Sequence, residues 1–198
     1  MVARRNFNRH SIRLKEYDYS QPGFYFVTIC VKNRQSVFGE IVEGCDKFTE
    51  PEIELSVLGE IVKNTWLSMP KHHNVEVDEF IVMPNHIHGI VVIKNRRGVA
   101  RYAPTRDFVK QPAGSLATVI CSFKSESSKL IHRVIGWEDF SWQRNYYEHV
   151  IRDEKSLTKI KNYIIDNYRK WHDDIENSNN NFSKSLVRQH YDLIFGQN

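Results

Sequence analysis

The sequence predicts an α+β protein in which helices pack on a mainly antiparallel sheet. Two observations support this fold class. Short runs rich in aromatic and β-branched residues, which are typical of strands, alternate along the chain with segments whose apolar residues recur at helical spacing. Two of the strand-like runs are separated only by Pro84-Asn85, which indicates antiparallel neighbours joined by a tight turn. The order strand, strand, helix, strand, strand, helix, strand, helix favours a layered structure with the helices on one face of the sheet.

The individual elements follow from the same patterns. Pro22-Gly23 marks the turn before the first strand. Asp153 provides an N-cap for the third helix, whose apolar stripe reaches Trp171, and the polar run 177–181 precedes a terminal helix. The predicted strands cover residues 24–31, 37–42, 74–83, 86–93 and 142–150, and the predicted helices cover residues 56–69, 116–134, 154–171 and 183–195.

One principal domain is expected, because 198 residues suffice for a single buried core. The first 20 residues are basic and polar and are interpreted as an N-terminal arm. The domain itself is assigned to residues 21–175, and a C-terminal extension to residues 176–198. Residues 94–114 combine basic side chains with prolines and glycines, which indicates a basic loop inside the domain.

The composition excludes several classes of protein. Apolar residues make up 40% of the chain and charged residues 26%, a globular balance that excludes disordered and fibrous proteins. The three widely spaced cysteines match no zinc or disulfide pattern, no apolar run approaches the roughly 18 residues of a membrane span, and no secretion signal is expected. We therefore expect a cytoplasmic protein. A net charge of +4 and a pI of about 8.9 are compatible with a polyanionic partner.

The strongest local pattern is Met83-Pro84-Asn85-His86-Ile87-His88-Gly89-Ile90. Side chains alternate between the faces of a strand, so His86 and His88 point the same way and can share a metal ion. Gly89 permits close approach of a ligand or another backbone. The alternative is that the two histidines are partly buried polar residues of a strand, because the His-x-His pattern is short and no third ligand is evident beside it.

A second candidate feature lies on the third helix, where Tyr163 and Asn167 are four residues apart and share a face. A phenol, an amide oxygen and two imidazoles together would suit metal-assisted phosphoryl transfer, with the tyrosine oxygen as nucleophile. The alternative is that Tyr163 packs in the core, in which case Tyr146, Tyr147 or Tyr168 is an equally good candidate.

Several separated segments resemble the REP-associated tyrosine transposases of the HUH endonuclease superfamily. They occur in the order found in that family and extend over roughly residues 11 to 172. The matching segments are Arg13-Leu14-Lys15-Glu16-Tyr17-Asp18-Tyr19, Gly23-Phe24-Tyr25-Phe26-Val27-Thr28, Met83-Pro84-Asn85-His86-Ile87-His88-Gly89, Ser122-Phe123-Lys124-Ser125, Trp142-Gln143-Arg144-Asn145-Tyr146-Tyr147-Glu148-His149-Val150-Ile151-Arg152-Asp153 and Tyr163-Ile164-Ile165-Asp166-Asn167.

The resemblance implies a ferredoxin-like sandwich, with helices packed on the faces of a central antiparallel sheet. It also implies that His86, His88 and Asn167 bind Mg²⁺ or Mn²⁺ and that Tyr163 is the nucleophile. The implied reaction is a transesterification that nicks and rejoins single-stranded DNA near hairpins through a 5′-phosphotyrosine. Tyr168 stands where the family usually has proline, so the helix is free to continue beyond Asn167.

The DNA contacts are predicted from charge and aromatic character. Phosphates would bind basic side chains, and unpaired bases would stack on an exposed aromatic ring. The predicted contacts are Arg13, Lys15, Arg96, Arg97, Lys124, Lys129, Arg144, Tyr146 and Arg152.

Two other functions remain open from the sequence. The first is a hairpin-DNA-binding regulator that keeps the scaffold without cutting, and the second is an unrelated zinc hydrolase that uses His86, His88 and a third ligand. The protein is expected to be a monomer or a homodimer, to be associated with the nucleoid and to have no contact with a membrane.

Overall fold

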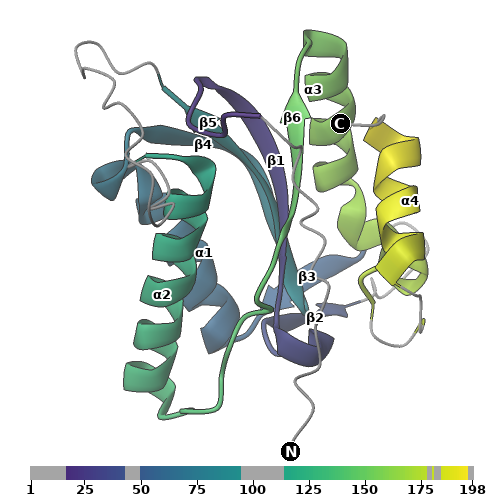
Figure 1. The fold of residues 1–198 in the computed structure, drawn as a ribbon. Helices are drawn as coiled ribbons and strands as arrows, with labels where there is room; N and C mark the ends of the chain where they lie inside the picture. The colour runs from purple at the N-terminus through teal and green to yellow at the C-terminus, as the bar shows by residue number, and fades with distance from the viewer. Residues whose placement is uncertain (1–16, 43–49, 95–113, 178–179, 181–183, 196–198) are drawn as a thin grey trace, which may run out of the picture.

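The computed structural model describes residues 17–42, 50–94, 114–177, 180 and 184–195. Within these residues the chain forms strands, α-helices and two 3₁₀ helices (Figure 1). In chain order these are β1 (Gly23–Cys30), η1 (Lys32–Arg34), β2 (Gly39–Val42), β3 (Glu52–Leu55), α1 (Val57–His72), β4 (Val75–Met83), β5 (His86–Ile93), α2 (Leu116–Ile135), β6 (Tyr147–Ile151), α3 (Glu154–Ile165), η2 (Asn167–Asp173) and α4 (Lys184–Phe195).

The main sheet has four strands in the order β4-β5-β1-β6, and every neighbouring pair is antiparallel. Because α1 precedes β4 and α2 connects β5 to β6, the strands and helices follow the βαββαβ pattern of a ferredoxin-like sandwich. The predicted α+β fold class is therefore confirmed. A separate pair, β2 and β3, lies beside this core.

The prediction that the helices lie on one face of the sheet is wrong, because both faces are covered. Val27 of β1 packs in a core with residues of α1 and α2, whereas the adjacent Phe26 packs in a second core with residues of α3 and α4. Figure 1 shows α1 and α2 on one side of the sheet and α3 and α4 on the other. The order of elements does not specify which face a helix covers, and the alternation of apolar residues on both sides of β1 is the signal that does.

Two strands differ from the prediction. Residues Glu52–Leu55, which alternate charged and apolar side chains, form the strand β3, which was not predicted. The last strand begins only at Tyr147, because Trp142 forms an isolated bridge with Val31. Asp153 caps α3 as predicted, its Oδ1 accepting from the Ser156 N–H at 2.8 Å.

The third helix does not continue as an α-helix to Trp171. It ends at Ile165, and a 3₁₀ helix follows from Asn167. The N–H of Arg169 donates to the carbonyl of Asp166 at 3.2 Å, three residues back, as the tighter winding requires. This change of winding turns both Asn167 and Trp171 into the interior, where they are buried.

Gly89 serves a different purpose from the one expected. It lies on the face opposite the histidines, and a Cβ atom there would overlap the indole of Trp66 and lie 3.0 Å from Phe80 Cβ. The absence of a side chain at Gly89 therefore makes room for the Trp66 side chain of α1, and not for a ligand or another backbone segment. Among the described residues, no helix has both the length and the apolar character needed to cross a bilayer.

We expect Gly89→Ala to lower the free energy of unfolding by about 1–3 kcal/mol, because the added methyl overpacks the contact with Trp66. Urea unfolding of the variant and the wild type measures the change. The control is a double-mutant cycle with Trp66→Phe, whose smaller ring makes room for the methyl. Additive losses would contradict the proposed contact, whereas a smaller loss in the Trp66→Phe background supports it.

Candidate metal centre

The two histidines of the Pro84-Asn85 turn region lie at the start of β5 and are completely buried. Their side chains are on the same face of the strand, and the two Nε2 atoms are 2.9 Å apart. Cis ligands of an ion with bonds of about 2.1 Å are separated by roughly 3 Å. The spacing of His86 and His88 therefore matches that of two nitrogen ligands on one ion.

Asn85 fixes the protonation of His86. Its Nδ2 donates to two backbone carbonyls, that of Arg34 at 3.2 Å and that of Glu176 at 2.8 Å, so its Oδ1 is the atom that faces the imidazole. This oxygen lies 2.7 Å from Nδ1 of His86 and can only accept, so Nδ1 carries the proton. The lone pair of the neutral ring is consequently on Nε2, which faces His88.

The other imidazole is held in the same way, since Nδ1 of His88 lies 2.9 Å from Thr28 Oγ1. Burial lowers the pKa of His86 well below its ordinary value, and the neighbouring His88 and Arg34 lower it further. Burial, together with the charge of His190, lowers the pKa of His88 to about 3. Both rings are therefore neutral at physiological pH, the form that binds a metal ion.

A third donor comes from a carboxylate that the sequence analysis missed. Asp174 follows η2, and one of its oxygens lies within 4.8 Å of a ring nitrogen of each histidine. Burial raises the pKa of this carboxyl group to about 6, an effect opposed by the N–H of Glu176, which donates to Oδ1 at 2.6 Å. Its only sequence signal is its place in the acidic pair Asp173-Asp174, just beyond the recognised segments.

Asn167, the predicted third ligand, lies in the same region on η2. It is buried, and within the described chain its Oδ1 has no hydrogen-bond partner. A buried amide oxygen without a partner is costly unless it binds something. Two neutral imidazoles, a carboxylate and this amide oxygen form a donor set that fits a divalent cation.

Tyr163 of α3 lies next to the histidine pair, with its ring centroid 5.4 Å from that of His88. Its hydroxyl is buried and has no hydrogen-bond partner within the described chain. Burial raises the pKa of this phenol, and the carboxylates of Asp174 and Glu176 raise it further, whereas Tyr191 and Asn167 act in the opposite direction. The phenol is protonated at neutral pH.

Helix α4 packs beside the tyrosine on the same face of the sheet, since its Tyr191 and Phe195 rings also contact Phe26 of β1. The ring of Phe195 lies 5.2 Å from that of Tyr163, and the ring of Tyr191 lies 6.4 Å from it. Helices α3 and α4 lie side by side in Figure 1. The Tyr163 hydroxyl is buried in this conformation, so a phosphate group reaches it only if the packing around it changes.

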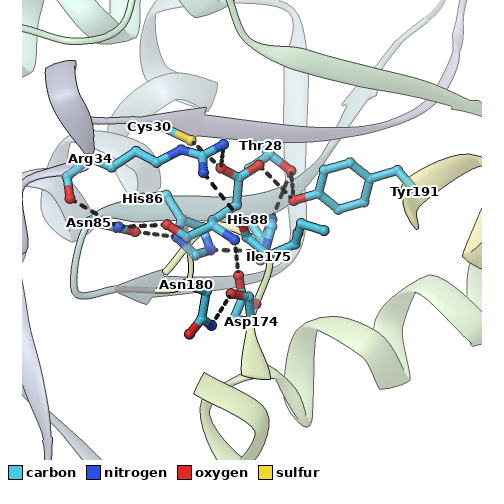
Figure 2. Close-up of polar contacts among 11 residues, drawn as sticks. Thr28, Cys30, Arg34, Asn85, His86, His88, Asp174, Ile175, Asn180 and Tyr191 are labelled. Carbon is cyan, nitrogen blue, oxygen red and sulfur yellow. Dashed lines mark hydrogen bonds and ion pairs between the residues drawn. The ribbon is translucent and has the colours of Figure 1, made fainter. Parts of the chain in front are cut away.

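Glu176 links the C-terminal segment to β1 and η1 through Cys30, Arg34 and Tyr191, which lie close together in Figure 2. Its carboxylate pairs with Arg34 Nη2 at 2.7 Å, accepts from the Tyr191 hydroxyl at 3.2 Å and accepts from Cys30 Sγ at 3.4 Å. Burial raises the pKa of Glu176, and the charge of Arg34 opposes this. The predicted domain boundary after residue 175 remains a prediction, although Glu176 and Tyr191 beyond it contact residues before it.

The predicted DNA contacts are dispersed over the molecule. Lys129 and Arg152 are exposed, and Lys129 lies 4.0 Å from Glu126. Arg144 is exposed near the outer end of the Val31–Trp142 bridge. Arg13, Lys15, Arg96 and Arg97 lie outside the described residues.

Lys124 and Tyr146 form a unit of their own. The Lys124 ammonium donates to the carbonyl of Gln143 at 2.8 Å and to that of Asn145 at 3.2 Å, and it lies 5.4 Å from the Tyr146 ring centroid. Burial lowers the pKa of Lys124 to about 8. The ammonium therefore holds the segment before β6 against α2, while the contact of either residue with DNA stays a prediction.

Comparisons with known proteins identify a relative of the chain and a solved structure with a similar fold. No family model matches it. An uncharacterized protein of Haemophilus influenzae is 38% identical over 173 residues, which cover 84% of this chain and 92% of the relative. The structure of a REP-associated tyrosine transposase bound to a REP hairpin superposes with a TM-score of 0.52 at 16% identity, over 80% of this chain and 72% of that protein. This superposition confirms the predicted resemblance at the level of the fold. The chain belongs to one family with the Haemophilus influenzae protein and has the fold of a REP-associated tyrosine transposase.

Proposed function

We propose that the protein is a metal-dependent endonuclease and transposase that nicks and rejoins single-stranded DNA near hairpins. The observation that carries this proposal is the position of the Tyr163 phenol beside two neutral imidazoles, a carboxylate and an amide oxygen. A hydroxyl nucleophile next to a divalent-cation site is the arrangement that phosphodiester transfer requires.

In the proposed reaction the Tyr163 oxygen attacks the phosphorus of one phosphodiester. The bond from phosphorus to the 3′ oxygen breaks, the tyrosine retains the 5′-phosphate, and the leaving 3′ oxygen takes up a proton as the phenol loses one. Attack by a 3′-hydroxyl on the phosphotyrosine reverses the step and releases the phenol. Because one ester is exchanged for another, no nucleotide cofactor is consumed.

The other residues of the site bind the cation or orient its ligands. His86, His88 and Asp174 would hold the cation, and Asn167 supplies a fourth donor atom. We propose Mg²⁺ or Mn²⁺, which when bound supplies positive charge to polarise the scissile phosphate. Asn85 and Thr28 keep both Nε2 atoms directed at the site through their contacts with the two Nδ1 atoms.

The proposed substrate is DNA with a hairpin, and the structural neighbour described above is bound to a REP hairpin. The protein would act as a monomer or a homodimer on DNA of the nucleoid, in the cytoplasm. Because Phe195 and Tyr191 cover Tyr163, cleavage also requires that α4 move away from α3 when DNA binds.

The experiment that tests the function is covalent capture of DNA. Purified protein is incubated with end-labelled oligonucleotides that carry a hairpin and a single-stranded flank, with Mn²⁺, Mg²⁺ or a chelator, and analysed on denaturing gels. We expect a protein–DNA adduct and a shortened strand with Mn²⁺ or Mg²⁺, and neither product with the chelator. Cleavage at equal rates in chelator would exclude metal-assisted chemistry.

A second candidate function is favoured by the burial of Tyr163. A regulator that binds hairpin DNA without cutting it needs no path from DNA to this hydroxyl. The same gels distinguish the two functions when they are run beside native gels. Metal-independent binding without any adduct over a broad panel of hairpins would favour the regulator.

A further inference from the structure

A cleft of about 670 Å³ opens beside the metal centre, and the function proposed above does not assign it. One wall is the turn of η1, residues 32–34, and the other is the segment 141–144 that precedes β6. Three of its lining residues are cations, namely Lys32, Arg34 and Arg144, and within the described chain no acidic residue lines it. A concave surface of this charge suits a polyanion.

The cleft is built rigidly. Beyond the end of the sheet, the N–H of Lys32 donates to the carbonyl of Ser141 at 2.9 Å, and the N–H of Gln143 donates to the carbonyl of Cys30 at 2.8 Å. The ammonium of Lys124 fastens the outer wall from α2 through the carbonyls of Gln143 and Asn145. A binding surface with both walls fixed loses little entropy when a ligand enters.

The inner wall has an unusual backbone. Asn33 and Arg34 have φ angles of 59° and 54°, in the left-handed region that side chains other than glycine rarely adopt. Such conformations persist where the surrounding contacts enforce them, and they concentrate at functional sites. Here the carbonyl of Arg34 accepts from Asn85 Nδ2, and its guanidinium pairs with Glu176.

Two of the three cations are available to a ligand. Lys32 and Arg144 are exposed, and neither makes an ion pair with any residue that the structure describes. The third cation, Arg34, is engaged in an ion pair with Glu176. Asn85 connects the two sites, since one amide contacts both the cleft turn and the imidazole of His86.

We infer that this cleft binds the sugar-phosphate backbone of single-stranded DNA next to the cleaved phosphodiester, with Lys32 and Arg144 contacting phosphates. The inference rests on the proposed function for the identity of the polymer. The cleft is open to solvent, which suits an extended strand, and its charge suits phosphates of any sequence.

The test measures binding in chelator, so that no cleavage takes place. Fluorescence anisotropy compares a labelled hairpin that carries a single-stranded tail of about 10 nucleotides with the same hairpin made blunt. The variant is Lys32→Gln with Arg144→Gln. The matched control is Lys63→Gln with Lys71→Gln, which removes two positive charges of α1, neither of which lines the cleft.

We expect the cleft variant to bind the tailed hairpin about tenfold more weakly and to reduce the slope of log affinity against log salt by about 1.4, or about 0.7 for each phosphate contact. Its affinity for the blunt hairpin should match that of the wild type, and the control variant should show neither change. Equal losses for both hairpins, unchanged binding of the tailed one, or no benefit from the tail in the wild type would overturn the inference. So would displacement of the tail by dTMP at concentrations close to that of the DNA, because a mononucleotide site would then be indicated.

The binding measurement does not depend on whether the protein cleaves DNA. Weaker binding of the tail by the cleft variant, together with no adduct in the presence of metal, would support the DNA-binding cleft and contradict the endonuclease function. Normal adduct formation with no effect of the cleft variant on tail binding would support the endonuclease function and contradict the DNA-binding cleft.

Discussion

Tyr163→Phe should reduce formation of the covalent DNA adduct by more than about a thousandfold while leaving the protein at least as stable as the wild type. The loss follows because phenylalanine has no oxygen to attack the phosphate. The stability follows from the packing, since the Tyr163 ring contacts Phe26, His88 and Phe195 through its edge and faces, and phenylalanine retains all three contacts.

The Tyr163 hydroxyl destabilises the folded state. A buried polar group with no partner costs about 1–3 kcal/mol, so removing it should raise the free energy of unfolding by about 1 kcal/mol in urea titrations. A residue that harms stability but is essential to a reaction is typical of a catalytic site. Unfolding or adduct gels alone would not separate catalysis from structure, so both measurements are needed on the same preparation.

The matched control is Tyr191→Phe, which makes the same chemical change on α4. The Tyr191 hydroxyl donates to Glu176 at 3.2 Å, so its loss should lower the free energy of unfolding by about 1 kcal/mol and leave an adduct attached to Tyr163. Cleavage that survived Tyr163→Phe would sink the nucleophile assignment. It would point to a metal-activated water held by His86, His88 and Asp174, or to Tyr146 or Tyr147 as the nucleophile.

Removing the carboxylate of Asp174 should weaken Mn²⁺ binding by at least about tenfold. The Asp174 oxygen lies within 4.8 Å of a ring nitrogen of both histidines, and even residues that only hydrogen-bond to a metal ligand contribute about 10–100-fold to metal affinity. Asp174→Asn keeps the shape and removes the charge, and electron spin resonance of free Mn²⁺ measures the affinity. Asn167→Leu, which removes the unpartnered amide oxygen, should weaken binding as well.

The control for Asp174 is the adjacent carboxylate. Asp173→Asn removes the same charge from an exposed position one residue away, and it should leave the affinity for Mn²⁺ within about twofold of the wild type. If Asp174→Asn bound Mn²⁺ as tightly as the wild type while Asn167→Leu did not, Asp174 would be a structural acid and Asn167 the third ligand. The opposite result would exclude Asn167 from the ligands.

The sequence was sufficient for those parts of the site that lie within one element. His86 and His88 share a face because of strand alternation, and Asp153 was recognisable as the cap of the helix that carries Tyr163. Strong local periodicity of this kind is retained in the fold because packing reinforces it. The same holds for the four strands of the main sheet, all of which were predicted: both ends of β5 are as predicted, whereas β6 begins five residues later than expected.

The remaining site residues could not be predicted because tertiary contacts bring them together. Asp174 reaches the histidines, and Glu176 reaches Arg34, from a segment that follows the tighter winding of η2. Tyr191 reaches Glu176 from α4, and no spacing in the sequence relates it to β1 or β5. Gly89 misled the sequence analysis for a similar reason, since its close neighbour is a tryptophan from α1, far away along the chain.

The strand that carries the histidines has one further property, which follows from its alternation. His88 lies opposite Thr28 on β1 and Ile81 on β4, and the turn Pro84-Asn85 sets that pairing. A slip of β5 by one residue would move both imidazoles into the core around Trp66 and bring Ile87 and Gly89 to the other face. Insertion of a single residue into this turn is therefore equivalent, for the chemistry, to deleting both histidines.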